Sequence, residues 1–150
     1  MAFNEYMNPW KYAEWAAAAT ATHGLSAMDE RITSARDIGE VWTSFCSWIE
    51  KNIAADEEGV IIAYNGAGCD MKWIWRLTQA PNALHAMPAR LAYFMDPLKM
   101  IKKWKLCEIN PLRSKLESLS LGSVWSYTNG GKSMEGAHDS LVDASAQMDI

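Results

Sequence analysis

One stretch, VIIAYNGAGCDMKWIWRL at residues 60–77, contains a complete strand–loop–helix pattern. Val60–Tyr64 is a continuous apolar run, which is typical of a central strand buried on both faces. Asn65–Gly68 follows with two glycines, as a tight loop at the end of a strand requires. Apolar residues then recur at helical spacing from Trp73 to Leu77, before Pro81 stops the helix. The stretch therefore predicts a strand, a glycine-rich loop and a helix.

The segments on either side continue this alternation. Asp56–Gly59 marks a turn before the first strand, and Leu91–Met95 has the composition of a second strand. Asp96 can cap a following helix, with Pro97 at its first position and three lysines between Leu98 and Trp104. Strands that alternate with helices predict an α/β domain with a mixed or parallel sheet. In such sheets ligands bind outside the carboxyl ends of the strands, where Asp70 begins the helix.

The amino-terminal third has its own pattern. Phe3–Met7 alternates apolar with polar residues and predicts a half-buried strand, while Trp10–Ala19 is rich in helix-forming residues. His23-Gly24 breaks the chain after this helix. Asp37, with Glu40 three residues later, predicts a capped helix. The apolar stripe of that helix consists of Ile38, Val41, Trp42, Phe45, Trp48 and Ile49.

The carboxyl-terminal third places a histidine five residues before an aspartate. A short helix is predicted near Ser114–Leu121, followed by a loop over Ser123–Gly136 and a final helix. Five residues separate His138 from Asp143, which is ~140° around an ideal helix. The two side chains can therefore converge only if His138 lies in the entry loop and Asp143 in the helix. A histidine beside an aspartate is also typical of exposed polar residues or of a helix cap.

Composition limits the class of protein. With 150 residues and 49% hydrophobic content, the chain is predicted to form one domain with a sizeable core that uses most of its eight tryptophans. The net charge of −4 favours no global attraction to nucleic acid. A local basic cluster, Lys99 to Lys105, is the exception, unless it is simply a solvated helix face. Three widely spaced cysteines and the lack of a long apolar run predict a soluble, intracellular protein without disulfides.

Four of these segments resemble, in order and spacing, the DEDDh (proofreading-type) 3′–5′ exonucleases of the ribonuclease H-like superfamily. The segments are Tyr64–Asp70, Asp96–Leu98, Leu116–Leu121 and His138–Ala144. Thr22–Leu25 is similar to the segment that lies before the second exonuclease motif in this family. The resemblance covers nearly the whole chain and implies a ribonuclease H-like mixed sheet flanked by helices.

The resemblance also implies roles for individual residues. Asp70 and Asp143 match carboxylates that bind Mg²⁺ or Mn²⁺, and His138 matches the general base that activates water. A histidine can take a proton near neutral pH without a large shift of its pKa. Asn65 resembles a polar residue near the scissile end, and Asp96 a structural aspartate behind the ligands. The segment expected to pack against the 3′-terminal nucleotide of DNA or RNA is Thr22, His23, Gly24 and Leu25.

The chain departs from the family at its first motif. Family members begin with an Asp-x-Glu pair on the first strand, and residues 1–150 do not contain that pair in the expected place. Asp56-Glu57-Glu58 has the right letters but precedes a different strand, so we do not expect it to substitute. We therefore expect a single exonuclease-like domain that is truncated at its amino terminus and lacks the first strand or strands. A two-metal site with too few carboxylates predicts weak or absent hydrolysis, and an open sheet edge predicts self-association.

Two other functions remain open from the sequence. The fold can serve as a non-catalytic binding or scaffold module that uses the Lys99 to Lys105 cluster or a tryptophan-rich cleft. The chain can also be a fragment of a longer, active exonuclease that supplies the missing pair or acts with a partner domain. Two further motifs are set aside: Gly131-Lys132-Ser133 lacks the first glycine and the leading strand of a phosphate-binding loop, and His85 has no partner at metal-ligand spacing.

Overall fold

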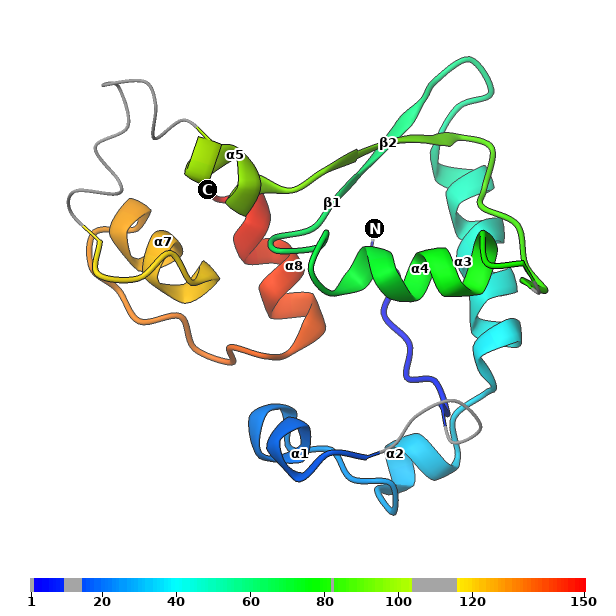
Figure 1. The fold of residues 1–150 in the computed structure, drawn as a ribbon, viewed down its shortest axis with the longest axis horizontal. Coiled ribbons are helices and arrows are strands. Elements are labelled where there is room, and N and C mark those ends of the chain that lie inside the picture. The colour runs from blue at the N-terminus through cyan, green and yellow to red at the C-terminus, as the bar shows by residue number, and fades with distance from the viewer. Residues whose placement is uncertain (1, 10–14, 82, 104–115) are drawn as a thin grey trace. The chain divides into compact units, whose positions relative to one another are not determined.

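The computed structural model describes residues 2–9, 15–81, 83–103 and 116–150. The chain divides into two compact units (Figure 1). The first consists of Met1–Glu58 with Met87–Arg90, and the second of Gly59–Ala86 with Leu91–Ile150. In the described residues the first unit is helical and the second contains the sheet. One domain over residues 1–150 stays a prediction.

The first unit contains the helices α1 (Ala17–His23), α2 (Glu30–Thr33) and α3 (Ile38–Asn52). The predicted cap of α3 is confirmed in both directions. The Asp37 carboxylate accepts a hydrogen bond from the Glu40 N–H at 2.9 Å, and the Glu40 carboxylate accepts one from the Asp37 N–H at 3.3 Å. Such a cap contributes ~1 kcal/mol. At the other end of α3, the Arg90 guanidinium donates to the carbonyl groups of Glu50 and Ile53, where a cation also complements the helix dipole.

The predicted strand at Phe3–Met7 is wrong. This segment is extended but pairs with no strand among the described residues, and only an isolated bridge joins Asn8 to Asp37. The apolar member that matters is Phe3, whose ring lies edge-on to Phe45 with the centroids 5.6 Å apart. Packing of Phe3 on α3 and the ion pair of Glu5 with Arg36, rather than strand pairing, therefore hold this segment.

The helix predicted over Trp10–Ala19 is displaced toward the carboxyl end. Residues 10–14 lie outside the described part of the chain, and α1 continues past Ala19 to His23. The predicted break is confirmed: Gly24 has a φ of 69°, and its N–H donates to the Thr20 carbonyl at 2.9 Å. Glycine adopts this left-handed conformation without a steric cost.

The second unit contains two parallel strands, β1 (Gly59–Ile62) and β2 (Leu91–Met95), and both were predicted. Val60 pairs with Tyr93 and Ile62 with Met95. The prediction that β1 is central and buried on both faces is wrong, because Val60 and Ile62 are each 48% exposed. The described residues thus show an α/β fold with a two-stranded sheet, and the ribonuclease H-like arrangement stays a prediction.

Four helices of the second unit are described: α4 (Asp70–Thr78), α5 (Pro97–Lys103), α7 (Leu121–Thr128) and α8 (Ser140–Met148). The predictions of α4, α5 and α8 are confirmed. The helix predicted near Ser114–Leu121 is wrong for residues 116–120, which are not helical, while Ser114 and Lys115 lie outside the described residues. The first part of the predicted loop over Ser123–Gly136 is helical, because α7 extends to Thr128. The Ser120 side chain accepts a hydrogen bond from the Ser123 N–H at 3.2 Å and caps the start of this helix.

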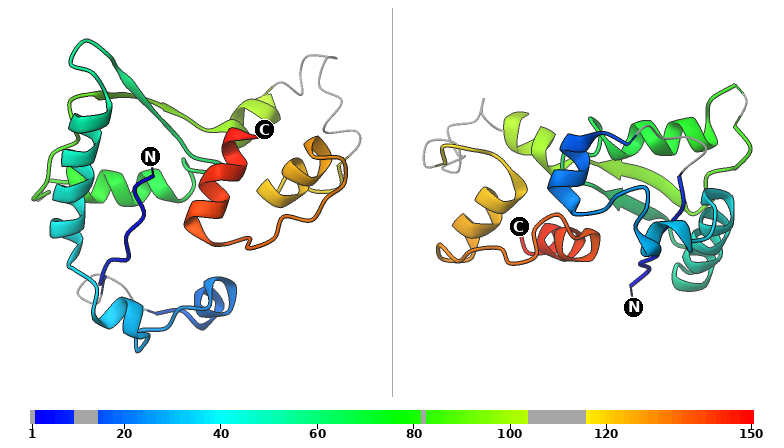
Figure 2. Two further views of the ribbon diagram at one scale, coloured as in Figure 1. Left: turned by 180° about the vertical axis from the view of Figure 1, so that it is seen from behind. Right: turned by 90° about the horizontal axis from the view of Figure 1, so that it is seen from below.

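Helices α7 and α8 lie side by side (Figure 2). Val124 of α7 and Ala146 of α8 are both buried. The indole N–H of Trp125 donates to the Asp149 carboxylate at 3.3 Å and joins the two helices at their outer side. In the part of the chain that the structure describes, no helix has both the length and the apolar character needed to cross a membrane.

Candidate functional site

Three predicted site residues of the second unit, Asn65, Asp70 and Asp96, follow the carboxyl ends of β1 and β2. Both strands run toward α5 and α8 (Figure 1). The chain leaves β1 through a loop at residues 63–69 and enters α4 at Asp70. It leaves β2 at Asp96, directly before α5. This is the end of a parallel sheet at which α/β proteins bind ligands.

Asp96 holds the glycine-rich loop in place. Its side chain is buried, with the residue only 6% exposed, and its carboxylate accepts hydrogen bonds from the N–H groups of Asn65 (2.9 Å) and Ala67 (3.2 Å). The same carboxylate accepts the Leu98 N–H at 3.1 Å and so caps α5. Buried carboxylates are stable only when hydrogen bonds satisfy them. Asp96 therefore acts as a structural link between the two strand ends.

The loop itself leaves no room for larger residues. A Cβ atom on Gly66 would lie 2.4 Å from the Ala63 Cβ and 3.2 Å from the Phe94 ring, so only glycine fits. Asn65 has a φ of 59°, a left-handed conformation that asparagine tolerates better than most residues. Its side-chain amide points back onto the loop, with Nδ2 3.9 Å from the Cys69 sulfur. The loop therefore delivers Asp70 to the first turn of α4 in an exposed position.

His138 and Asp143 meet at the start of α8. His138 lies in the entry loop with a φ of 73°, and Asp143 lies in the first turn of the helix, as their spacing predicts. The main-chain N–H of His138 donates to the Asp143 carboxylate at 3.2 Å, and this bond does not engage the exposed imidazole ring. Asp139 is the cap of α8, since its carboxylate accepts the N–H groups of Leu141 and Val142. Asp139 is thus the N-cap residue, and the bond from His138 to Asp143 also lies within the helix entry, as the helix-cap interpretation of this pair predicts.

Sequence reasoning missed Gln147, which ties α8 to the end of β1. Its side-chain oxygen accepts the Tyr64 N–H at 2.7 Å, and its amide donates to the Asp143 carbonyl at 3.2 Å. The one available sign was its position four residues after Asp143, on the same face of the helix. Tyr64 also donates its phenol to the Leu119 carbonyl at 2.7 Å. Burial, and to a lesser degree the charge of Asp96, raises the pKa of this phenol.

Asp70 lies at the start of α4, whereas His138 and Asp143 lie at the start of α8. Among the described residues, no three or more His, Cys, Asp or Glu side chains are grouped so that they could hold a metal ion. Two carboxylates and an imidazole are the right donor types for a hydrated Mg²⁺ or Mn²⁺ ion, but their number and grouping here do not define its site. The dependence on Mg²⁺ or Mn²⁺ stays a prediction from the resemblance.

Thr22, His23, Gly24 and Leu25, predicted to contact substrate, lie in the first unit and form the end of α1. The Thr22 hydroxyl donates to the Ala18 carbonyl at 3.0 Å, and the Leu25 N–H donates to the His23 Nδ1 atom at 3.0 Å. The His23 ring also packs edge-on against Trp15, with the centroids 6.4 Å apart. These contacts shape a helix end, and the substrate-binding role of this segment stays a prediction.

The described lysines of the basic cluster are exposed on one helix. Lys99, Lys102 and Lys103 are exposed on α5, whereas Leu98 and Ile101 on the opposite side are buried. Exposure fits both interpretations given to the cluster, a solvated helix face and a local nucleic-acid-binding patch. The fourth member, Lys105, lies outside the described residues.

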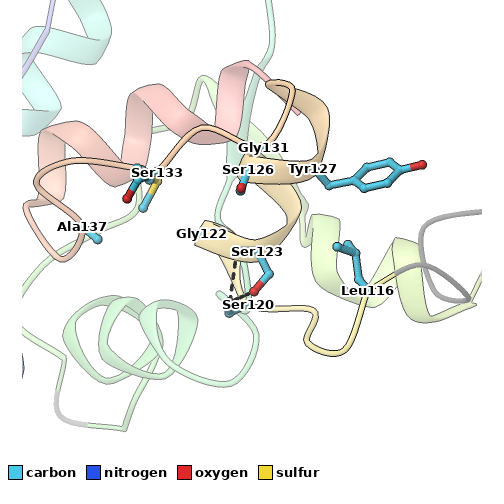
Figure 3. A pocket seen from close by; sticks show the side chains of 10 residues that line it. Leu116, Ser120, Gly122, Ser123, Ser126, Tyr127, Gly131, Ser133 and Ala137 are labelled. Carbon is cyan, nitrogen blue, oxygen red and sulfur yellow. Dashed lines mark hydrogen bonds between the residues drawn. The ribbon is translucent and has the colours of Figure 1, made fainter.

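A hollow of about 660 Å³ lies between α7 and the loop that follows it (Figure 3). Serine hydroxyls and small or apolar side chains line it, and Ser120 and Ser123 hydrogen-bond to each other at 2.8 Å. Gly131 is part of the lining. A phosphate-binding loop would follow a strand, but Gly131-Lys132-Ser133 follows helix α7, which agrees with setting this motif aside. No charged side chain of the described residues lines this hollow.

Comparisons of the chain with protein-family models, curated proteins and solved structures gave no match.

Proposed function

We propose that this protein is a 3′–5′ exonuclease-like, nucleic-acid-binding domain whose hydrolysis of DNA or RNA ends is slow or absent. The observation that supports the proposal is the joining of His138 to Asp143 at the start of α8, together with the Tyr64–Gln147 hydrogen bond that holds α8 at the end of β1. Asp70 follows the same strand through the glycine-rich loop. An exposed imidazole and two carboxylates are the residue types that phosphodiester hydrolysis uses.

Each residue has a distinct part in the proposal. His138 takes the proton from the attacking water, because its imidazole is exposed and no described hydrogen bond occupies the ring. Asp70 and Asp143 offer carboxylate oxygens, and Asn65 lies in the loop between β1 and Asp70. Slow hydrolysis is expected because the Asp-x-Glu pair of the resembling family is not found in its expected place in residues 1–150, and because Asp143 already accepts a main-chain N–H.

The test is digestion of 5′-labelled single-stranded DNA and RNA in Mg²⁺ or Mn²⁺. We expect slow stepwise shortening from the 3′ end, reduced ~10²- to 10⁴-fold by His138→Ala, the usual contribution of a general base. His85→Ala is the matched control, because His85 lies in another loop of the same unit. Shortening that His138→Ala leaves unchanged would contradict the proposed base. If digestion is fast and His138→Ala abolishes it, the proposal of slow hydrolysis is wrong. The metal ligands would then include residues other than Asp70 and Asp143.

A second candidate is a binding module without catalysis. The exposed lysines of α5 favour it, since Lys99, Lys102 and Lys103 follow directly on Asp96 at the end of β2. Its test is the salt dependence of oligonucleotide affinity, because the slope of log affinity against log salt changes by ~0.7 for each phosphate of a single strand that a lysine neutralises. If Lys102→Ala and Lys103→Ala leave both the affinity and this slope unchanged, the lysines do not bind nucleic acid.

A further inference from the structure

The outer face of α4 presents four large side chains to solvent. We define this platform as Lys72, Trp73, Trp75 and Arg76, all of which are exposed. The opposite face is half-buried and explains why the segment is helical, because its apolar residues recur at spacings of three. These residues are Met71, Ile74 and Leu77. One side of the helix is therefore half-buried, and the solvent side carries two tryptophans.

The tryptophans flank the two cations. On an ideal helix Lys72 and Arg76 lie ~40° apart, with Trp75 ~60° to one side and Trp73 ~60° to the other. The Arg76 guanidinium lies 5.2 Å from the centre of the Trp73 ring, within the range of a cation–π contact. Each tryptophan is nevertheless 53% exposed. Rings of this size normally contribute to a core or to a binding surface. The two exposed rings lie ~160° apart, at the two edges of the solvent side of the helix, and so border a surface suited to binding a partner.

A hollow beside this platform extends it toward the glycine-rich loop. It has a volume of about 360 Å³ and is lined by Ala67, Met71, Lys72, Trp75 and Arg76. A volume of this size falls within the range of ~300–1,000 Å³ that is usual for small-molecule sites. Trp75 forms an aromatic wall, and both cations reach the rim. A flat aromatic group with an attached anion would match this combination.

The charge of the platform is local and positive. Lys72 and Arg76 form no ion pair with an acid of the described residues, and the chain as a whole carries a net charge of −4. The nearest acid along the helix is Asp70, one turn before Trp73 and therefore beside the platform rather than within it. A purely apolar partner would leave the two cations without partners, whereas a polyanion with flat bases would satisfy both kinds of side chain.

We propose that this face of α4 binds single-stranded nucleic acid, with bases stacked on Trp73 and Trp75 and phosphates paired with Lys72 and Arg76. Alternating aromatic and cationic side chains are the general means by which proteins hold single strands without reading their sequence. A duplex is excluded because its bases are already stacked and cannot reach the rings. The inference rests on the proposed function in one respect. The platform lies on the helix that begins at Asp70, so the substrate of the proposed site would be a single strand.

The test measures affinity without hydrolysis. Fluorescence anisotropy of a labelled deoxythymidine oligonucleotide is followed in EDTA, which removes the divalent ions that cleavage would need. We expect Trp73→Ala and Trp75→Ala each to weaken binding ~5- to 150-fold, the range for removal of one stacked base. Tyr127→Ala, which removes an exposed aromatic ring from α7, is the matched control and should leave affinity unchanged. Trp73→Phe should retain most of the binding, so a folding defect in the alanine variants can be recognised.

The cations provide an independent measurement. Lys72→Ala should reduce the slope of log affinity against log salt by ~0.7, as expected for one phosphate contact on a single strand. Lys132→Ala, an exposed lysine in the loop after α7, should not change that slope. The inference is overturned if the wild-type protein binds no oligonucleotide in EDTA, if a duplex binds as tightly as the single strand, or if both tryptophan variants bind normally. None of these results depends on cleavage, whereas the exonuclease-like part of the proposed function is judged by the effect of His138→Ala on hydrolysis.

Discussion

The main-chain N–H of Tyr64 donates a 2.7 Å hydrogen bond to the side-chain oxygen of Gln147, across 83 residues of sequence. This bond satisfies a half-buried backbone group just past the end of β1 and positions α8 beside it. Because His138 and Asp143 lie at the start of α8, the geometry of the candidate site depends on this contact. Removing it should affect the stability of the second unit and the placement of the site together.

Gln147→Leu tests that dependence. The substitution keeps the size of the side chain but leaves the Tyr64 N–H without its acceptor, which should cost ~1–3 kcal/mol in the free energy of unfolding. Urea denaturation gives this quantity directly. Gln79→Leu is the control, because Gln79 is exposed at the end of α4. Equal stabilities for the two variants would show that the Tyr64 contact contributes nothing.

Asp96→Ala should be more damaging than the removal of an exposed acid. Its carboxylate accepts the N–H groups of Asn65, Ala67 and Leu98, so the substitution leaves several donors unsatisfied. Since hydrogen bonds to a charged group are worth ~1.5–3 kcal/mol each, we expect stability to fall by about 3 kcal/mol or more. Asp56→Ala, in the exposed turn before β1, should change stability by less than ~0.5 kcal/mol. If urea denaturation showed Asp96→Ala to be equally mild, the carboxylate would not be what holds the loop.

Two glycines should respond in opposite directions to the same substitution. Gly66→Ala places a Cβ atom 2.4 Å from the Ala63 Cβ, so the loop must move, at a cost of ~1–3 kcal/mol. Gly122→Ala meets nothing within 4 Å and lies inside α7, where alanine should stabilise by up to ~1 kcal/mol. Thermal denaturation of both variants measures the contrast. A stabilising Gly66→Ala would mean that the loop is not closely packed at this point.

The raised pKa of Tyr64 predicts that stability falls at alkaline pH. Burial is the main cause of the shift, and the charge of Asp96 adds to it, so the folded protein holds the phenolic proton more tightly than the unfolded chain does. This contribution is fully present below the ordinary tyrosine pKa of 10.0 and disappears as pH rises through the folded pKa. Tyrosinate absorbance, compared between wild type and Tyr64→Phe, should show this phenol ionising at higher pH in the folded protein than in urea. Identical titrations would contradict the shift.

Local chemistry explains which elements could be predicted. The cap of α3 needs only Asp37 and Glu40, and the start of α5 needs only Asp96 and Pro97, so both are encoded within a few residues. The same holds for the glycine-rich loop before α4. The position of His138 in a loop and Asp143 in a helix also follows from their spacing alone.

The wrong predictions have two causes. Some depend on contacts between residues that are distant in sequence, and others concern segments whose composition is compatible with two kinds of secondary structure. Phe3–Met7 has the alternation of a strand, but a strand needs a neighbour, and Phe3 packs on Phe45 instead. Val60 and Ile62 are apolar enough for a central strand, yet a two-stranded sheet leaves them exposed. Helix α7 contains serine and glycine residues that are typical of loops. Gln147 could not be paired with Tyr64 from sequence because nothing in either residue indicates the other.

The exposed face of the sheet carries the last prediction, which concerns self-association. Val60 and Tyr93 are direct partners across the strands and share one face with Ile62, and these side chains are 48%, 58% and 48% exposed. Apolar strands with unpaired edges associate with other chains. We expect light scattering of the purified protein to show association that grows with concentration and falls in Val60→Thr/Ile62→Thr, since threonine keeps the strand propensity while adding a hydroxyl. Met28→Thr, at an exposed apolar residue of the first unit, should leave association unchanged. A wild-type protein that stays monomeric at high concentration would show that this face does not cause self-association.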